Sequence, residues 1–217
     1  MAHPRLRRAA ASLGIALLLA TGVVGCEGAP APVAPAGSQE EVRAFETKEW
    51  GEIYGRTLQL HIPIPEPRRW SMAERGNEIA GIHSPSHSKL VVTFWEERDL
   101  QNRTTCRAGA ERDGLLVKRT MTVLEEHVVA LPDAYDTRFW VAVEGARADG
   151  RRAGHVFAAG AFLRRCFLFH FESSVPTDEH SAVLGERLAA AQIMLNRMKF
   201  DPPRVGDDGR VPVEKRP

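Results

Sequence analysis

Hydrophobic and polar residues alternate through much of the middle of the chain, which is the pattern of half-buried β-strands. Residues 58–62 alternate in this way, and Pro63 and Pro65 are expected to end that strand. Residues 89–95 combine branched and aromatic side chains, which strands favour. The Asp149–Gly150 pair is typical of a turn between two paired strands. Further strands are expected at residues 70–73, 78–83, 120–131, 137–144, 154–163 and 165–172.

The pattern changes near the end of the chain, where apolar residues recur at intervals of three and four. This is the period of one face of an amphipathic helix. Thr177 is a candidate N-cap, and Asp178 and Glu179 suit the positive end of the helix dipole. The residues of the expected apolar face are Leu184, Leu188, Ala191, Leu195 and Met198.

A second, shorter helix is expected around Cys106 and Ala110. Thr104 or Thr105 would cap its start, and Gly114 would stop it. Most of the remaining pattern is strand, and a sheet buries its apolar face under another layer. We therefore expect an α+β fold, in which an antiparallel sheet is packed by the long C-terminal amphipathic helix in a single domain.

The N-terminus has the pattern of an export signal. Arg5, Arg7 and Arg8 precede an almost wholly apolar run, which is shorter than the roughly 20 residues of a membrane-spanning helix. The run closes on Val23-Val24-Gly25-Cys26, which resembles the lipobox of bacterial lipoproteins. The resemblance implies cleavage before Cys26 and makes its thiol the lipidation site. The alternatives are an ordinary secretory signal with an incidental cysteine, and an uncleaved anchor.

Lipidation would divide the chain into four parts. Residues 1–25 would be the signal peptide, and residues 26–44 a lipidated cysteine with a tether rich in proline and alanine. Residues 45–200 would form the globular α+β domain, and residues 201–217 a disordered tail. The acyl chains would attach the protein to a membrane. Glu27, directly after the cysteine, resembles the default signal for the outer membrane, so we expect the domain to face the periplasm.

Charge excludes one class of partner. The chain has 29 basic and 28 acidic residues, and loss of the three arginines of the signal leaves 26 and 28, a net charge of −2. Nucleic-acid binding needs a clustered basic face. The basic pairs at residues 68–69, 151–152 and 164–165 are interpreted as parts of solvated turns. We therefore expect no nucleic-acid partner.

Two cysteines remain once Cys26 is acylated. Cys106 and Cys166 would lie in an oxidising compartment, which favours a disulfide between them. Two buried free thiols are the alternative. The sequence has no Cys-x-x-Cys spacing, so we expect no redox catalysis.

The sequence lacks the local motifs of catalysis: a Gly-x-Ser-x-Gly elbow, a His-Glu-x-x-His helix and a glycine-rich phosphate loop. His83 and His87 have the spacing of a metal pair on a helix, but Pro85 lies between them. We interpret both as exposed turn residues. His155 and His170 lie on expected strands and are interpreted as edge or surface residues. We expect no metal, no cofactor and no enzymatic activity, although a site assembled only in space leaves no local trace.

Four aromatic residues need separate interpretations. Trp95 and Trp140 lie in apolar strands and are expected in the core. Trp50 and Tyr54 follow the tether. They either dock the chain onto the domain or expose an interaction surface, because aromatic residues are enriched at binding hot spots.

One resemblance covers roughly residues 57–200. A strand that ends at Trp95, a segment that carries Cys106, and an Arg165-Cys166-Phe167 strand before a C-terminal helix resemble uncharacterised lipoproteins of δ-proteobacteria. In outline the chain also resembles the sheet-plus-helix folds of PsbP and Mog1-like proteins. Neither resemblance supplies catalytic residues.

These observations favour a lipid-anchored envelope protein that binds or scaffolds an envelope protein partner without catalysis. A carrier or sensor of a small or lipidic ligand is the second hypothesis, and an envelope hydrolase is the third. An apolar pocket beneath the C-terminal helix would favour the carrier. Convergent histidines and carboxylates in a cleft would favour the hydrolase.

Replacing Cys26 tests the lipobox interpretation. Cys26→Ser should abolish incorporation of a labelled fatty acid, because serine lacks the thiol that is acylated. Metabolic labelling followed by electrophoresis measures the effect. Label that persists in the variant would contradict the interpretation.

Overall fold

The computed structural model describes residues 42–56, 58–116, 120–130, 136–162 and 164–201, which all fall in one unit, Ser38–Pro217. Cys26, the signal sequence and most of the tether lie outside the described residues, and so does the tail from residue 202 onward. The expectations for those segments therefore stay predictions.

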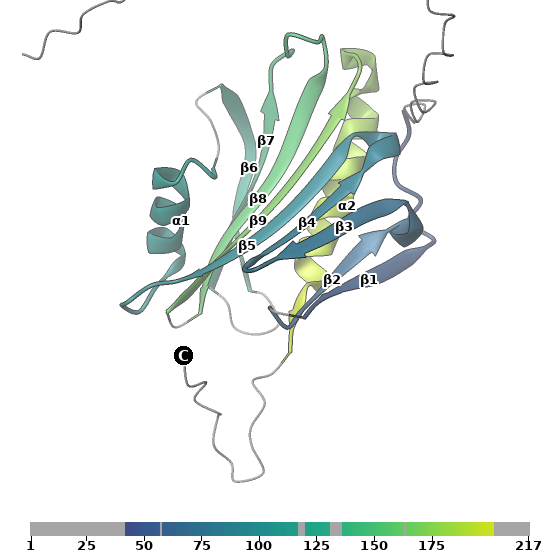
Figure 1. Cartoon of the computed structure of the whole chain (residues 1–217). Helices are drawn as coiled ribbons and strands as arrows, with labels where there is room; N and C mark the ends of the chain where they lie inside the picture. The colour runs from purple at the N-terminus through teal and green to yellow at the C-terminus, as the bar shows by residue number, and fades with distance from the viewer. Residues whose placement is uncertain (1–41, 57, 117–119, 131–135, 163, 202–217) are drawn as a thin grey trace, which may run out of the picture. The chain divides into compact units, whose positions relative to one another are not determined.

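Seven strands form the main sheet, in the order β3-β4-β5-β9-β8-β7-β6 (Figure 1). Every neighbouring pair is antiparallel. Each strand expected between residues 70 and 172 is present, and the turn with Asp149 and Gly150 lies between β7 and β8 as expected. The strands are Trp70–Arg75 (β3), Glu78–His83 (β4), Ser88–Glu96 (β5), Met121–Ala130 (β6), Asp136–Glu144 (β7), Arg152–Phe162 (β8) and Arg165–Val175 (β9).

A smaller sheet, in the order β1-β2-β10, joins the start and the end of the described chain. The expectation that Pro63 ends its middle strand was wrong, because that strand continues to Pro65. β10 pairs with this strand only at Leu60 and His61. Beyond His61, the side of β2 that faces β10 has no partner strand among the described residues. Proline is tolerated on such an unpaired side, because no neighbouring strand needs its missing N–H. The strands are Trp50–Gly55 (β1), Leu60–Pro65 (β2) and Lys199–Phe200 (β10).

The first helix, α1 (Arg103–Arg112), begins after Asn102, not after Thr104 or Thr105 as expected. The Asn102 side chain accepts hydrogen bonds from the backbone N–H groups of Thr104, at 2.9 Å, and Thr105, at 3.0 Å. Thr105 Oγ1 accepts one in return from Asn102 N at 3.0 Å, which completes a capping box. This pattern fixes where α1 starts.

The second helix, α2 (Ser181–Arg197), starts later than expected, since a 3₁₀ helix, Asp178–His180, follows Thr177. Its expected apolar face is buried throughout, from Leu184 to Met198. Among the described residues, neither helix has both the length and the hydropathy required to cross a membrane.

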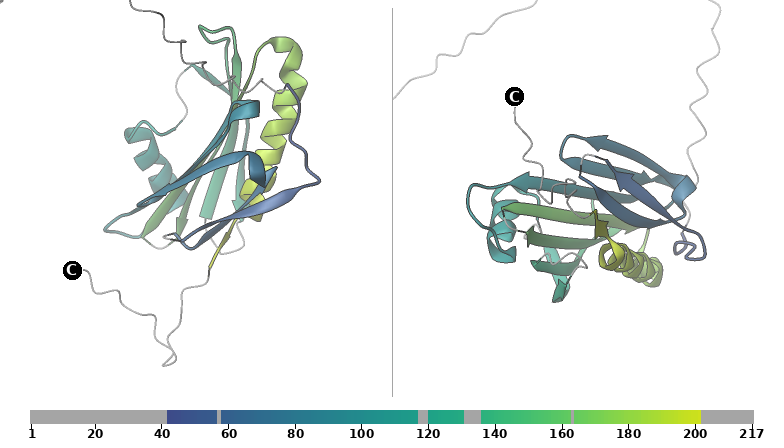
Figure 2. Two further views of the ribbon diagram at one scale, coloured as in Figure 1. Left: turned by 45° about the vertical axis from the view of Figure 1, so that its right-hand side comes forward. Right: turned by 90° about the horizontal axis from the view of Figure 1, so that it is seen from below.

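The two helices lie on opposite faces of the main sheet (Figure 2). α2 and β2 cover one face together, and their apolar side chains pack on those of β4, β5, β8 and β9. α1 packs on β7, β8 and β9 from the other face. The core beneath α1 contains Ala110, Leu116, Trp140, Phe157, Ala159 and Leu168.

A disulfide joins Cys106 on α1 to Cys166 on β9, as the sequence favoured. The two Cα atoms are 5.4 Å apart, and both side chains are fully buried. The bridge therefore fixes α1 covalently to the main sheet.

Removing this disulfide should destabilise the domain. It joins residues 60 positions apart, for which the chain-entropy model gives about 4 kcal/mol. In the double variant Cys106→Ala, Cys166→Ala, the free energy of unfolding should be lower by about 4 kcal/mol. Urea denaturation measures this difference. On non-reducing gels, reduction should change the mobility of the natural chain but not of the variant. Thiol labelling of both cysteines after denaturation without reductant would contradict the bridge.

Candidate functional site

Among the described residues, two groups of polar side chains that lie on opposite faces of the main sheet have fully buried members. On the α2 face, mostly buried groups join α2 to the segments before β3 and β5, and we call them the polar network. On the α1 face, outside the core that α1 covers, two histidines lie beside an arginine and two carboxylates, and we call them the histidine cluster. The polar network consists of Arg43, Glu66, His83, Ser86, Ser88, Ser173 and Arg187, and the histidine cluster of Glu144, Arg147, His155, His170 and Glu172.

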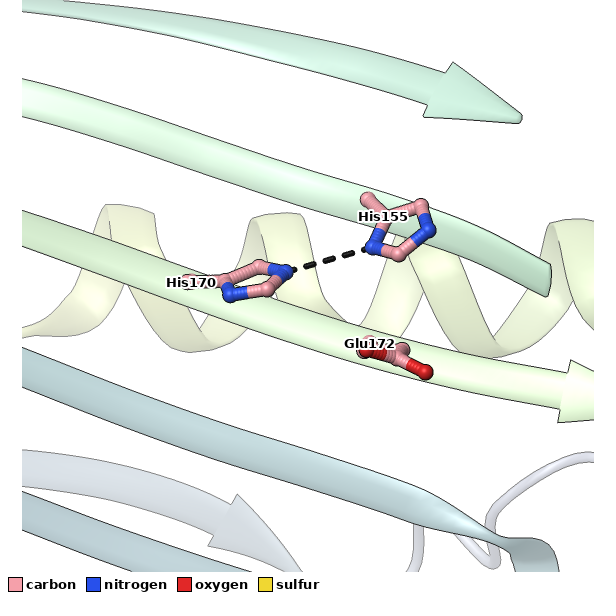
Figure 3. Close-up of side chains that lie close together, drawn as sticks. All are labelled: His155, His170 and Glu172. Atoms are coloured by element: carbon pink, nitrogen blue, oxygen red, sulfur yellow. Dashed lines mark hydrogen bonds between the residues drawn. The ribbon is translucent and has the colours of Figure 1, made fainter. Parts of the chain in front are cut away.

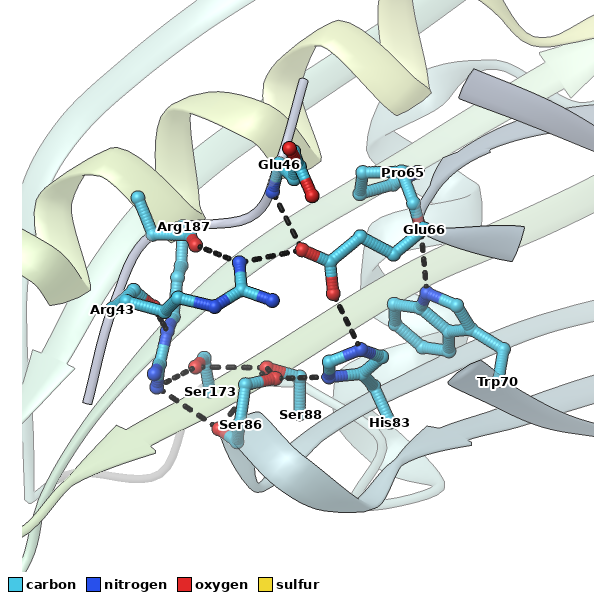
Figure 4. Close-up of polar contacts among 11 residues, drawn as sticks. Arg43, Glu46, Pro65, Glu66, Trp70, His83, Ser86, Ser88, Ser173 and Arg187 are labelled. Carbon is cyan, nitrogen blue, oxygen red and sulfur yellow. Dashed lines mark hydrogen bonds and ion pairs between the residues drawn. The ribbon is translucent and has the colours of Figure 1, made fainter. Parts of the chain in front are cut away.

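Arg187 is the centre of the polar network (Figure 4). It lies three residues after Leu184 and four before Ala191, so it falls on the apolar face of α2. Its side chain is fully buried. The sequence analysis missed it, although a charged residue at this spacing was the available signal.

The guanidinium of Arg187 is satisfied by oxygen atoms from three segments. Nη1 donates to the carbonyl oxygens of Ser86, at 2.9 Å, and Ser174, at 3.1 Å, and to Ser173 Oγ at 3.4 Å. Nε donates to the carbonyl oxygen of Arg43 at 2.9 Å. A buried guanidinium without such partners would cost several kcal/mol. Arg187 therefore ties α2 to β9, to the turn before β5 and to the N-terminal segment.

Glu66 is the negative charge of the network and is 5% exposed. Its Oε1 accepts hydrogen bonds from Arg43 Nη1, at 2.6 Å, and from the backbone N–H of Glu46, at 2.7 Å. Its Oε2 lies 3.1 Å from His83 Nε2. Residues 43–46, where the expected tether meets the domain, are thus held by both Arg187 and Glu66.

These contacts change the acidity of Glu66. Burial alone would raise the pKa of its carboxyl group, but the hydrogen bonds from Arg43 and Glu46 N–H outweigh that effect. The charges of Arg43 and His83 act in the same direction, so the pKa lies below its ordinary value. The network therefore depends on an ionised Glu66.

His83 connects Glu66 to a row of serines. Its Nδ1 lies 2.6 Å from Ser86 Oγ, which lies 2.9 Å from Ser88 Oγ, and Ser88 Oγ donates to Ser173 Oγ at 2.9 Å. Carboxylate, imidazole and hydroxyl in contact have the order of a serine-hydrolase triad. However, Ser86 is 3% exposed and His83 is 1% exposed. A substrate cannot reach the hydroxyl in this arrangement, which is therefore structural.

Backbone strain occurs on two sides of this network. Glu66 has φ = 50° and His87 has φ = 47°, a region that side chains other than glycine enter at a cost. The strained conformation of Glu66 turns the chain between β2 and β3, and that of His87 separates Ser86 from Ser88. His87 is exposed as expected, but the interpretation of His83 as exposed was wrong.

The histidine cluster is built by the register of β8 and β9. His155 stands directly opposite Glu172, and His170 stands opposite Phe157. Strand alternation places all four side chains on the α1 face. His155 Nδ1 lies 3.2 Å from His170 Nε2 (Figure 3). The ring of His170 stacks on Phe157 with centroids 4.3 Å apart.

Arg147 closes the histidine cluster from the loop between β7 and β8. Its Nε lies 2.7 Å from Glu144 Oε2 on β7, and its Nη2 lies 2.9 Å from Glu172 Oε1 on β9. Because β8 runs between β7 and β9, this bridge spans the strand that carries His155. His155 is only 1% exposed, and its Nε2 lies 3.9 Å from Glu144 Oε1.

The bridge also sets the charges of its members. Burial alone would lower the pKa of Arg147 and raise that of Glu172. The hydrogen bonds of Arg147 with Glu144 and Glu172, and the charges of both carboxylates, raise the pKa of Arg147 instead, so it stays a cation. The hydrogen bond and the charge of Arg147 lower the pKa of Glu172. The charges of His155 and His170 also lower the pKa of Glu172.

The interpretation of His155 and His170 as edge or surface residues was wrong. β8 and β9 are inner strands of the sheet, and each is paired on both sides. The sequence carried one signal for this, because residues 154–163 are almost wholly apolar, as in strands that are buried on both faces. A histidine within such a run is buried with it.

The candidate interaction surface of Trp50 and Tyr54 lies on β1. Trp50 is partly buried against the main core, and Arg197 lies over its ring at 5.8 Å. Tyr54 is 42% exposed and donates a hydrogen bond to Asp201 Oδ2 at 2.8 Å. The two residues therefore lie in different surroundings. Of the expected core tryptophans, Trp140 is fully buried and Trp95 partly buried.

The class of fold follows from comparison with solved structures. The Ran-binding protein Mog1p of Saccharomyces cerevisiae is similar over 70% of this chain and 95% of its own, with a TM-score of 0.52 and 9% identity. A protein of Bacteroides thetaiotaomicron is similar over 70% of this chain and 48% of its own, with a TM-score of 0.42 and 8% identity. Neither a protein-family model nor a curated protein sequence matches the chain. The chain therefore has a Mog1-like fold, as its outline predicted.

The polar network predicts an acid-sensitive contribution to stability. Glu66→Gln should lower the free energy of unfolding by about 2 kcal/mol at neutral pH, because it removes a charged hydrogen-bond acceptor from a buried site. The pKa of Glu66 is lower in the folded state, so its contribution is complete above about pH 4.3, where an unfolded glutamate titrates, and is lost as pH falls through the lower folded value. Urea denaturation at several pH values measures both effects.

Glu46→Gln is the matched control for this experiment, because Glu46 contributes its backbone N–H, and not its side chain, to the contact with Glu66. Its stability should remain close to that of the natural chain. Equal losses in the two variants would show that the carboxylate of Glu66 has no special role.

Proposed function

We propose that the protein is a non-catalytic binding protein, anchored to the outer membrane through an acylated Cys26 and facing the periplasm. Its domain would bind another protein of the envelope. The observation that carries this proposal is the partly uncovered α1 face of the main sheet. The lipobox-like sequence and the firm attachment of residues 43–46 support the role of the preceding segment as a tether.

Outside the core beneath α1, this face has a cross-strand row of apolar and polar residues, several of which are exposed. α1 covers Trp140, Phe157 and their neighbours, but the next row toward the β7–β8 loop lies outside that core. Ile82 is 51% exposed and Val123 is 46% exposed, one toward each edge of the sheet. Contact with a partner would remove these two apolar side chains from water, which is favourable. The row is Ile82, Lys89, Glu172, His155, Ala142 and Val123. His155 and Ala142 are buried within it, and the other four side chains are exposed or half-buried.

Two further observations support binding without catalysis. Among the described residues, Glu66, His83 and Ser86 are the group that most resembles a hydrolase triad, and all three are buried away from any substrate. The similar protein Mog1p binds Ran, so this fold is compatible with a protein partner. The mixed charges of the mature chain support the exclusion of nucleic acid.

The carrier hypothesis has weaker support. It needs space between α2 and the sheet, but the contact there is close at Gly154. A Cβ atom at this position would lie 2.7 Å from Leu188 Cδ1 and 3.3 Å from Leu184 Cδ1. The helix and sheet are thus already in contact at this point.

Site-specific crosslinking in cells tests the proposed binding surface. A photo-crosslinking amino acid at position 82 should capture a defined envelope protein in the full-length, anchored chain, because Ile82 lies on the uncovered face. The same amino acid at position 189 is the control. Ala189 is an exposed residue of α2, and α2 covers the other face of the main sheet. Mass spectrometry identifies the adducts.

Capture of the same partner from both positions, or from neither, would count against this surface. Recovery of a bound lipid with the purified chain, together with no protein adduct at position 82, would favour the carrier instead.

A further inference from the structure

The histidine cluster brings three metal-ligand side chains together on one face of the sheet. One donor atom each from His155, His170 and Glu172 lies within 4.8 Å of the other two. Figure 3 shows the two imidazoles facing each other from β8 and β9, with the Glu172 side chain beside them on β9. We infer that these residues bind a divalent transition-metal ion of the zinc class. His155 and Glu172 also belong to the row proposed as the binding surface, but the inference of a metal site does not rest on the proposed function.

The distance between the two imidazole nitrogens fits such an ion. Zinc–nitrogen bonds of about 2.05 Å at a tetrahedral angle place two ligand nitrogens roughly 3.3 Å apart. His155 Nδ1 and His170 Nε2 are 3.2 Å apart. For both nitrogens to bind one ion, each ring must turn from its present contact so that its lone pair points to a common position beside this line. The same distance suits a hydrogen bond between the rings, so an experiment must separate the two.

The positions of the ligands are set before any ion binds. His155 and Glu172 are opposed in the register of two inner strands, and so do not depend on a loop for their placement. Phe157 stacks nearly parallel to His170, at an interplanar angle of 12°, and to His155, at 14°. Ligands held by rigid strands and packed rings lose little conformational entropy on binding.

The charge around the site favours a cation. Glu144 and Glu172 carry two negative charges against one positive charge on Arg147. Metal binding requires neutral imidazoles, and in that state the five residues of the histidine cluster have a net charge of −1. Lys89, opposite Glu172 on β5, is exposed to solvent. Arg147 binds Glu172 through Oε1, and a carboxylate has a second oxygen that can bind a metal. Glu144 Oε1 lies 3.9 Å from His155 Nε2, beyond hydrogen-bond distance, so it would have to move closer to orient that ring in the way that outer carboxylates orient metal-bound histidines.

The chemistry of the ligands selects the class of ion. Imidazole nitrogen suits zinc, copper and nickel, whereas calcium and magnesium favour sites made of oxygen. Two histidines and one glutamate supply three ligands, and a water molecule would complete a tetrahedral site. His170 is only half-buried, which gives an ion access from that side.

Zinc titration of the purified full chain, made without a histidine tag and carrying Cys26→Ser to remove its thiol, tests the inference. Isothermal titration calorimetry after chelator treatment should give one zinc per chain, and zinc should raise the melting temperature. His170→Asn and Glu172→Gln should each weaken binding at least about tenfold, as expected when a member of a metal site is lost. An equal concentration of magnesium should produce no stabilisation.

His127→Asn is the matched control, because His127 and Glu125 form another histidine–carboxylate pair, 2.8 Å apart and exposed. It should bind zinc like the unsubstituted chain. His170 and Glu172 are not fully buried, so their variants should fold, and circular dichroism checks this. Absence of zinc binding by the unsubstituted chain would overturn the inference, and so would unchanged affinity in folded His170→Asn and Glu172→Gln.

Discussion

The guanidinium of Arg187 enters the core of the domain from α2, where a positive charge must find hydrogen-bond acceptors or destabilise the fold. The acceptors come from Arg43, Ser86, Ser173 and Ser174, which belong to three separate segments of the chain. These segments must therefore assemble around α2 for the charge to be tolerated. The packing of α2, the turn before β5 and the docking of the N-terminal segment all depend on this interaction.

The opposite face of the sheet is organised by a weaker element. α1 has 10 residues, and a helix of that length is marginal in isolation. Its capping box and the disulfide from Cys106 to Cys166 compensate for its length. Because the disulfide attaches α1 to the Cys166 end of β9, the helix covers the sheet near Trp140 and leaves His170 and Glu172 outside its core. The exposed half of this face thus follows from where the covalent bond lies.

Local patterns were sufficient to predict most of the secondary structure. Alternation located the strands of the main sheet, and the helical period located α2, because both signals reflect burial on one side of an element. The end of β2 was misplaced, because proline interrupts a strand only where its N–H would be needed by a neighbouring strand. On the side of β2 that faces β10, the pairing ends at His61. The cap of α1 was misplaced by two or three residues, because Asn102 and two threonines are all capable of capping.

Neither polar site could be predicted in the same way. Glu66 and His83 are 17 residues apart, and the turn between β2 and β3 brings them together. His155 and His170 are 15 apart, and the register of β8 and β9 brings them together. Register follows from the turn geometry and the whole hydrophobic pattern, which a single short motif does not contain. A lone charge on an apolar helix face and a histidine in an apolar strand were the only local signals.

The two sites differ in how their polar atoms are satisfied, and this separates a structural role from a binding role. Backbone groups take part in the polar network: Glu66 accepts from Glu46 N–H, and Arg187 donates to three carbonyl oxygens. Exchanging those partners for a ligand would require the chain to move. The contacts that define the histidine cluster join side chains, and its covering group, Arg147, lies on a loop. Side chains can change partners by rotation alone, so the histidine cluster can accept an ion while the sheet beneath it stays unchanged.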